Sequence, residues 1–228
     1  MTSAAERGPE RPVAVVDALR AAISEGEFAP NQRLVEADLS EQFGASRAAV
    51  RAALLELTSE GLVERMQNRG ARVRAISLDE AVEITEVRMV LEGLLAAKAA
   101  TRLSDDDRTR LRGIGAAMEH AVSAGDLLGY SERNRELHAL VREAGEQRTA
   151  GRILERLRGQ NVRHQFRLAM HPGRPSVSLP QHLAIIDALC AGDPDRAEEA
   201  MRAHLRSVVE TLPEVGSAPT RVVEPQRW

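Results

Sequence analysis

The 228-residue sequence has little cysteine, lysine or aromatic character. Its single cysteine, Cys190, excludes a disulfide framework and a zinc site built from several thiolates. Aromatic residues make up only 2% of the chain, which argues against a surface that stacks nucleic-acid bases. No apolar run approaches the roughly 18 residues of a membrane span, and the polar N-terminus lacks the apolar segment of a secretory signal. We therefore expect a cytoplasmic protein without a membrane partner.

The charge is nearly balanced, and almost all of the positive charge is arginine. The chain holds 31 basic and 34 acidic residues, and Lys98 is its only lysine. The stretch 44–74 carries a local excess of arginine over glutamate, which points weakly to phosphate binding and is also typical of a solvated helix face. With 43% hydrophobic residues the composition is that of a globular protein, and the length suggests two domains.

Apolar spacing and turn residues predict a winged helix-turn-helix over residues 12–75. Ser46 is a natural N-cap for the last of its helices. Two short alternating strands then flank a turn at 67–70 and form a hairpin. The three helices are expected over residues 12–25, 35–43 and 47–60. Residues 1–11, rich in charge with Gly8 and Pro9, are predicted to be a disordered arm.

From residue 76 onward the pattern is helical throughout. Capping signals, such as Ser104 with Asp107 and Asp193 before Pro194, divide it into about six helices with short connections. These helices are expected over residues 78–102, 104–124, 125–144, 146–169, 179–191 and 193–212. Residues 76–212 are therefore an antiparallel all-α bundle, and the chain as a whole is mainly α. The proline-containing tail, 213–228, is predicted to be disordered.

The third helix is the candidate DNA-reading element. Arg47 begins it and Arg51 follows one turn later, so both arginines share a face. A helix-turn-helix presents the N-terminal residues of its second helix to the major groove, where arginine can bond guanine through two hydrogen bonds. The cap hydroxyl of Ser46 and the free N–H groups beside it also suit a phosphate. The residues alone leave open a solvent-facing helix whose arginines pair with nearby glutamates.

Five segments resemble the DNA-binding domain of the GntR family of bacterial transcriptional regulators. They read PNQRL at 30–34, LS at 39–40, GASRAAVRAAL at 44–54, EGLV at 60–63 and NRGARV at 68–73. The resemblance implies that Arg47 and Arg51 approach DNA from the helix and that Arg69 and Gly70 approach it from the wing. Arg33 is carried over as a phosphate contact. Alanines 48 and 49 replace a usual Thr-Pro, which removes a polar group near the groove.

Three of the six histidines lie on apolar helix faces. His138 follows Asn134 by four positions, so both project from one face, while His182 and His204 lie among apolar neighbours on later helices. A lone histidine of this kind is usually a hydrogen-bonded core residue. Three of them need either separate buried partners, since each unsatisfied donor costs roughly 1–3 kcal/mol, or one divalent metal that they share. The cores of helical bundles are frequent sites for such ligands.

The same histidines resemble the metal-binding pattern of the helical FCD effector domain, which marks the FadR-type subfamily of GntR regulators. Arg88-x-x-x-Glu92 also matches the opening of that domain. The resemblance implies a divalent ion, for which such ligands suit zinc, nickel or a similar metal. It further implies a small carboxylate effector beside the ion, with Arg88 as the candidate partner. The implied metal ligands are Asn134, His138, His182 and His204.

These features predict a homodimeric regulator, repressor or activator, that binds palindromic operator DNA and responds to a small carboxylate. A metal-sensing regulator and a purely structural metal remain alternatives. A metal-dependent hydrolase is a third, since a bound ion could activate water. It is disfavoured because Asn134 stands where a carboxylate base would be expected, and we expect no enzymatic activity.

Overall fold

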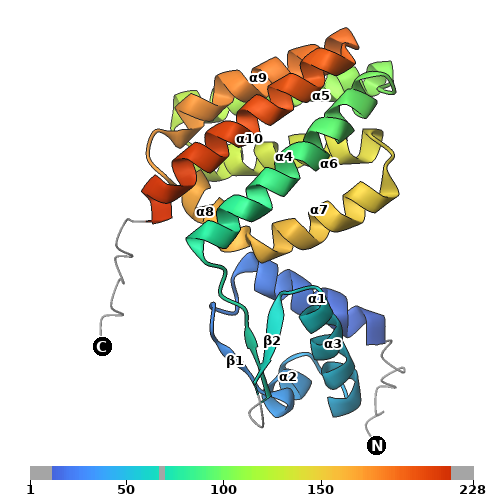
Figure 1. Ribbon diagram of the computed structural model, residues 1–228, viewed down its shortest axis with the longest axis vertical. Helices are drawn as coiled ribbons and strands as arrows, with labels where there is room; N and C mark the ends of the chain where they lie inside the picture. Colours follow the sequence, from blue (N-terminus) through green and yellow to red (C-terminus); the bar gives the residue numbers. More distant parts are fainter. Residues whose placement is uncertain (1–11, 67–69, 217–228) are drawn as a thin grey trace, which may run out of the picture. The chain divides into compact units, whose positions relative to one another are not determined.

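The computed structural model describes residues 12–66 and 70–216 (Figure 1). The chain divides into two compact units, one made of the residues up to Ser77 with Glu155–Arg163 and the other of Leu78–Leu154 with the residues from His164 onward. The first holds a small sheet and the second is helical, so the predicted mainly-α fold class is confirmed. No helix of the described ranges is long and apolar enough to cross a membrane.

The first unit is a winged helix-turn-helix with a three-stranded antiparallel sheet, in the order β1-β3-β2. Its elements are α1 (Pro12–Glu25), β1 (Arg33–Leu34), α2 (Glu36–Gln42), α3 (Arg47–Ser59), β2 (Val63–Met66) and β3 (Gly70–Val73). In the hairpin, Val63 pairs with Val73 and Met66 with Gly70. Strand β1 adds Arg33 opposite Arg72. The sequence analysis missed β1, because two residues are too few to show an alternating pattern.

The turn between α2 and α3 is closed by backbone geometry that suits glycine. Gly44 has a φ of 60°, a left-handed conformation that commonly ends a helix. Its N–H donates to the carbonyl of Glu41 at 3.3 Å, and the N–H of Ala45 donates to that of Ser40 at 3.0 Å. Two carbonyls at the end of α2 are thereby satisfied, and the chain is directed into Ser46 at the start of α3.

The core of the first unit forms where its three helices meet the inner face of the hairpin. Leu19 of α1, Leu39 of α2 and both Val50 and Leu57 of α3 are at most 2% exposed. Because Val50 and Leu57 face inward, the opposite side of α3 faces solvent. The packing therefore determines which side chains of α3 are available to a partner.

Seven helices follow in the described part of the chain, and they form the second unit except for Glu155–Arg163, which belongs to the first (Figure 1). They are α4 (Leu78–Ala100), α5 (Asp105–Ala124), α6 (Leu127–Ala144), α7 (Arg148–Gln160), α8 (Val162–Ala169), α9 (Arg174–Ala191) and α10 (Pro194–Gly216). Helices α9 and α10 form an antiparallel pair across a short turn at Gly192, which has a φ of 72°. Helix α4 packs against α10, α6 and α9. These four helices enclose one apolar interior.

Two predicted helix boundaries in this unit are wrong. The helix expected over 146–169 is two helices, α7 and α8, which end and begin on either side of Asn161. Gly159 and Asn161 both have low helix propensity, which favours a break there. Helix α9 begins at Arg174 and not near residue 179. Pro175 lies in its first turn, where no backbone donor is needed, and Pro180 continues the helix on an exposed side.

The last helix is also longer than expected. A helix end before Pro213 was predicted, with a disordered tail from that residue, but α10 continues through Pro213 to Gly216. A proline inside a helix removes one backbone hydrogen bond. Leu212 is only 2% exposed, so its packing holds the turn in place despite that loss. The predicted arm at 1–11 and the rest of the tail, 217–228, lie outside the described residues.

Candidate functional site

The N-terminus of α3 presents its capped end and two arginines to solvent. Ser46 adopts an extended conformation and its Oγ accepts a hydrogen bond from the N–H of Ala49 at 3.2 Å. Arg47 and Arg51 are both exposed, whereas Val50 and Leu57 of the same helix are buried. Neither arginine is therefore taken up by the core, and the arrangement leaves this face open to a groove of duplex DNA.

The structure nevertheless pairs Arg51 with an acidic side chain of its own unit. Nε and Nη2 of Arg51 donate to the two carboxylate oxygens of Glu36, at 3.1 and 2.7 Å. This hydrogen bonding lowers the pKa of Glu36. Arg51 remains 70% exposed. Arg47 makes no ion pair within the described residues, so the predicted alternative of arginine–glutamate pairing holds for Arg51 and not for Arg47.

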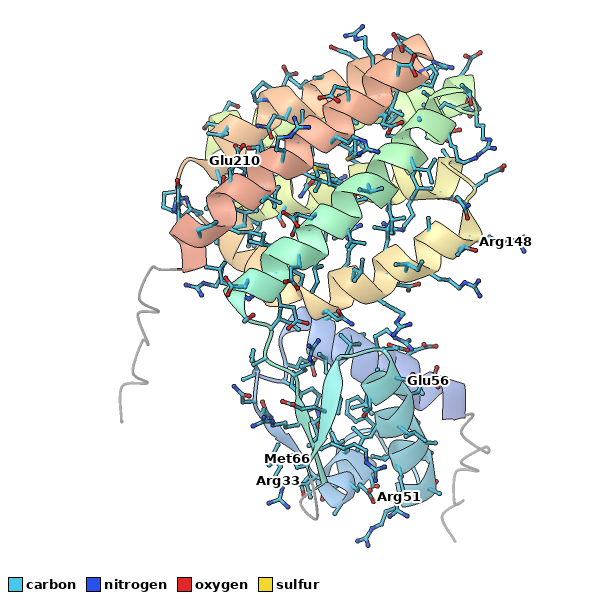
Figure 2. All side chains as sticks on the ribbon, viewed as in Figure 1. Arg33, Arg51, Glu56, Met66, Arg148 and Glu210 are labelled. Carbon is cyan, nitrogen blue, oxygen red and sulfur yellow. The ribbon has the colours of Figure 1, made fainter. Side chains whose placement is uncertain are left out.

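The remaining DNA-binding candidates lie on the sheet. Figure 2 shows the exposed Arg33 of β1 and Met66 at the end of β2 near the same end of this unit as Arg51. Gly70 begins β3 with a φ of 86°, a conformation that glycine adopts without strain. Arg69 lies outside the described residues. The first unit thus gathers Arg33, Arg51 and Met66 at one end (Figure 2).

The second unit brings the three predicted histidines together. His138 projects from α6, His182 from α9 and His204 from α10, and all three are at most 4% exposed. One ring nitrogen from each lies within 4.8 Å of the others. The ring centroids of His182 and His204 are 4.3 Å apart, and that of His138 is 6.0 and 5.6 Å from these two. We call these three residues the histidine cluster.

Each imidazole of the histidine cluster is held through its Nδ1 by a different side chain. His138 Nδ1 lies 2.6 Å from Oε2 of Glu92, and His182 Nδ1 lies 2.8 Å from the hydroxyl of Tyr130. His204 Nδ1 lies 3.0 Å from Oε1 of Gln181. Such contacts fix ring orientation and tautomer, as the outer partners of metal-binding histidines do.

Two buried acceptors near this centre support a cation. Nε2 of His182 and Oδ1 of Asn134 are inaccessible to solvent and have no hydrogen-bond partner among the described residues. Asn134 lies one turn before His138 on α6. A divalent ion satisfies nitrogen and amide oxygen ligands together. The residues present fit such an ion.

Burial keeps two members of the histidine cluster in the form that binds metals. Burial lowers the pKa of His182 well below its usual value, and the neighbouring His138 and Arg174 lower it further. Burial likewise lowers the pKa of His204, with added effects from the other two histidines. Both rings are therefore neutral at pH 7, and neutral imidazole is the metal-binding form.

Arg88, the candidate effector contact, is buried beside the cluster. Its Nε and Nη2 both donate to Oε1 of Glu92, at 2.8 and 2.7 Å, while the other oxygen of Glu92 contacts His138. Arg88 is 5% exposed and therefore does not face solvent. The sequence analysis noted Glu92 only as part of a motif, and it missed Tyr130 and Gln181. The spacing of four residues between Arg88 and Glu92 was the sequence feature that could have predicted their ion pair, because such residues are neighbours on one helix face.

Comparison with known proteins covers both units. Residues 13–73 match the bacterial regulatory proteins of the gntR family, and residues 83–207 match the FCD domain. The HTH-type transcriptional repressor RspR of Escherichia coli is 27% identical over 217 residues, which cover 94% of this chain and 95% of that protein. A probable D-xylose utilization operon transcriptional repressor of Paenarthrobacter nicotinovorans is 30% identical over 183 residues, 80% of each chain.

Solved structures agree in fold. E. coli McbR/YncC superposes with a TM-score of 0.75 at 22% identity, covering 89% of this chain and 97% of the other. A putative GntR transcriptional regulator from Rhodococcus sp. RHA1 gives 0.71 at 22% identity, covering 92% and 99%. The matching families are regulators and not enzymes, as expected from the sequence. The chain belongs to the gntR family of bacterial transcriptional regulators that bind DNA, in the subfamily that carries an FCD domain.

Proposed function

We propose that the chain is a homodimeric repressor that binds a palindromic operator and is controlled by a small carboxylate held beside a divalent metal ion. The histidine cluster carries the sensing half of this proposal, because three buried imidazoles from three helices converge with their Nδ1 atoms already bonded. The relatives named as repressors favour repression over activation.

The DNA-binding half depends on the exposed face of α3. Ser46 leaves free N–H groups at a helix N-terminus, which favours a phosphate. Arg47 and Arg51 on the same face have the donor geometry to bond guanine in the major groove. Arg33 and Gly70 lie on the sheet, where Arg33 can contact phosphate and Gly70 allows the backbone to come close. Together with Arg69 they are the proposed DNA contacts.

In the sensing half, Asn134 and the histidine cluster would hold the ion. Bound there, a zinc or nickel ion with an open position would supply a Lewis-acidic site for a carboxylate oxygen. The protein's own part is to keep His182 and His204 neutral, to orient the three rings through Glu92, Tyr130 and Gln181, and to exclude bulk water from the interior. Glu92, the carboxylate that contacts His138, is already bonded to Arg88.

Homodimerisation is favoured by an apolar stripe on α4. Val87, Val90 and Leu94 recur every three to four residues on the outside of this helix and are 49%, 49% and 38% exposed. Contiguous exposed apolar side chains of this kind commonly mark a protein interface. A second copy of the chain would cover the stripe, and its two-fold symmetry would match a palindromic operator.

Control of DNA binding requires that the effector bind one arrangement of the dimer better than the other, since a ligand with equal affinity for both shifts nothing. The test uses duplex DNA selected from a random pool by the zinc-loaded wild-type protein. A library of small carboxylic acids should contain members that change the affinity for this duplex. Zinc alone changing the affinity, with no response to any acid, would favour a metal-sensing regulator and overturn the carboxylate proposal.

A further inference from the structure

Arg174, at the start of α9, is a buried guanidinium without a carboxylate partner. Its residue is 5% exposed, and it forms no ion pair in the described part of the chain. Nη1 donates to the hydroxyls of Ser207 and Thr211 at 3.0 and 2.9 Å, and more weakly to the carbonyl of Ser207 at 3.4 Å. Nη2 is buried and has no acceptor among the described residues.

Comparison with Arg88 shows that the lack of a counter-charge at Arg174 is unusual. Arg88 is equally buried, yet its charge is balanced by Glu92 at 2.7 Å. Burying a charge without a counter-charge is costly, and hydroxyl groups compensate it only in part. Arg88 thus has no need of an external anion, whereas Arg174 has both an uncompensated charge and a free pair of N–H hydrogens. Of the two, Arg174 is the better candidate for a ligand's anionic group.

Arg174 lies on the same buried face of α9 as His182 of the histidine cluster. Arg174, Ser178 and His182 follow one another at intervals of four on α9, so they share a face. Ser178 is 5% exposed and shares a hydrogen bond with Tyr130, whose hydroxyl contacts His182. Ser207 and Thr211, which hold Arg174, follow His204 by three and seven residues on α10. Along the axis of α9, Arg174 lies about 12 Å from His182 at roughly 1.5 Å per residue.

We propose that Arg174 binds a second anionic group of the effector, and that the effector class is therefore a dicarboxylic acid. One carboxylate lies at the histidine cluster and the other bonds Nη2 of Arg174, and Ser178 and Tyr130 are the polar residues that connect Arg174 to His182. The inference rests on the proposed function, in which the cluster holds an ion that receives a carboxylate. It replaces Arg88 with Arg174 as the residue that recognises the acid.

The test compares acids of matched length on the zinc-loaded full chain. Isothermal titration calorimetry measures succinate, glutarate and adipate against butyrate, pentanoate and hexanoate. We expect at least one dicarboxylate to bind about tenfold or more tightly than its monocarboxylate partner, as a charge-assisted buried hydrogen bond implies. The preference should disappear in Arg174→Gln, persist in part in Arg174→Lys and persist fully in the exposed control Arg152→Gln, with zinc content unchanged in all four proteins.

Three outcomes overturn the inference. If the wild type binds mono- and dicarboxylates equally tightly, the dicarboxylate inference fails and the proposed function is unaffected. Retention of the preference in Arg174→Gln does the same. If no acid binds the zinc-loaded wild type, the carboxylate part of the proposed function fails as well. Should Arg174→Gln not fold, the wild-type comparison and Arg174→Lys decide the question.

Discussion

Arg51 shows how one residue can be engaged within its own fold and still be the best candidate for base contact. Its two bonds to Glu36 orient the guanidinium without burying it. The ion pair is exposed and contributes little to stability. Its effect is to restrict the rotamers of an arginine that lies one turn into α3.

Replacement of Arg51 by alanine is expected to weaken binding to the selected duplex by about 5- to 150-fold, since a bidentate base contact contributes roughly 1–3 kcal/mol of discrimination. Binding to unrelated duplex DNA should change much less. Fluorescence anisotropy at fixed salt measures both affinities, with Arg152→Ala as a control for the loss of an exposed arginine elsewhere. Equal affinity of Arg51→Ala and wild type for the selected duplex would contradict the assignment.

The histidine cluster predicts a pH dependence for the metal-free chain. His182 and His204 have lowered pKa values in the folded state, so below about pH 6.5 the unfolded chain binds protons that the folded chain does not. The free energy of unfolding should therefore fall as the pH drops from 7 to 5. Urea unfolding of chelator-treated protein measures this, and His204→Gln should show a shallower decrease. A free energy that stays constant over this range would contradict the buried, neutral state.

At the scale of elements, much of the fold followed from local signals. Ser46 and Gly44 marked the ends of α3 and α2, and the apolar spacing of 138, 182 and 204, together with the resemblance to the FCD domain, predicted the cluster. Strand β1 was not predicted because two residues are too few to show an alternating apolar pattern. The break at Asn161 was not predicted because a single residue of low helix propensity does not interrupt the apolar spacing of a helix. Glu92, Tyr130, Gln181 and Arg174 were missed as site residues because their partners lie on other helices, and only packing selects them.

Substitutions of Ser46, the N-cap of α3, should affect folding stability and DNA affinity differently. Ser46→Ala removes the bond to the N–H of Ala49 and should lower the free energy of unfolding by about 1 kcal/mol. Ser46→Asp keeps a capping oxygen and should restore that loss. Its negative charge should nevertheless weaken binding to the selected duplex, because it would face phosphate. Urea unfolding and anisotropy measure the two effects, and unchanged DNA affinity in Ser46→Asp would remove Ser46 from the DNA contacts.

Binding of the proposed palindromic operator requires two copies of the chain. Val90→Glu places a charge in the middle of the apolar stripe on α4 and should shift the protein towards monomer in sedimentation velocity at micromolar concentration. Leu128→Glu is the matched control, since Leu128 is 64% exposed on α6 and lies outside the stripe. If both variants sediment as the wild type does, the stripe is not the dimer contact.

The whole molecule combines DNA binding and sensing only if the histidine cluster holds an ion. The most direct test is elemental analysis of full-length protein after dialysis against zinc and removal of the excess. We predict about one zinc per chain for the wild type and for His120→Ala, an exposed histidine on α5. His138→Ala/His182→Ala, shown by circular dichroism to keep its helical content, should retain almost none. A double variant with as much zinc as the wild type would contradict the account.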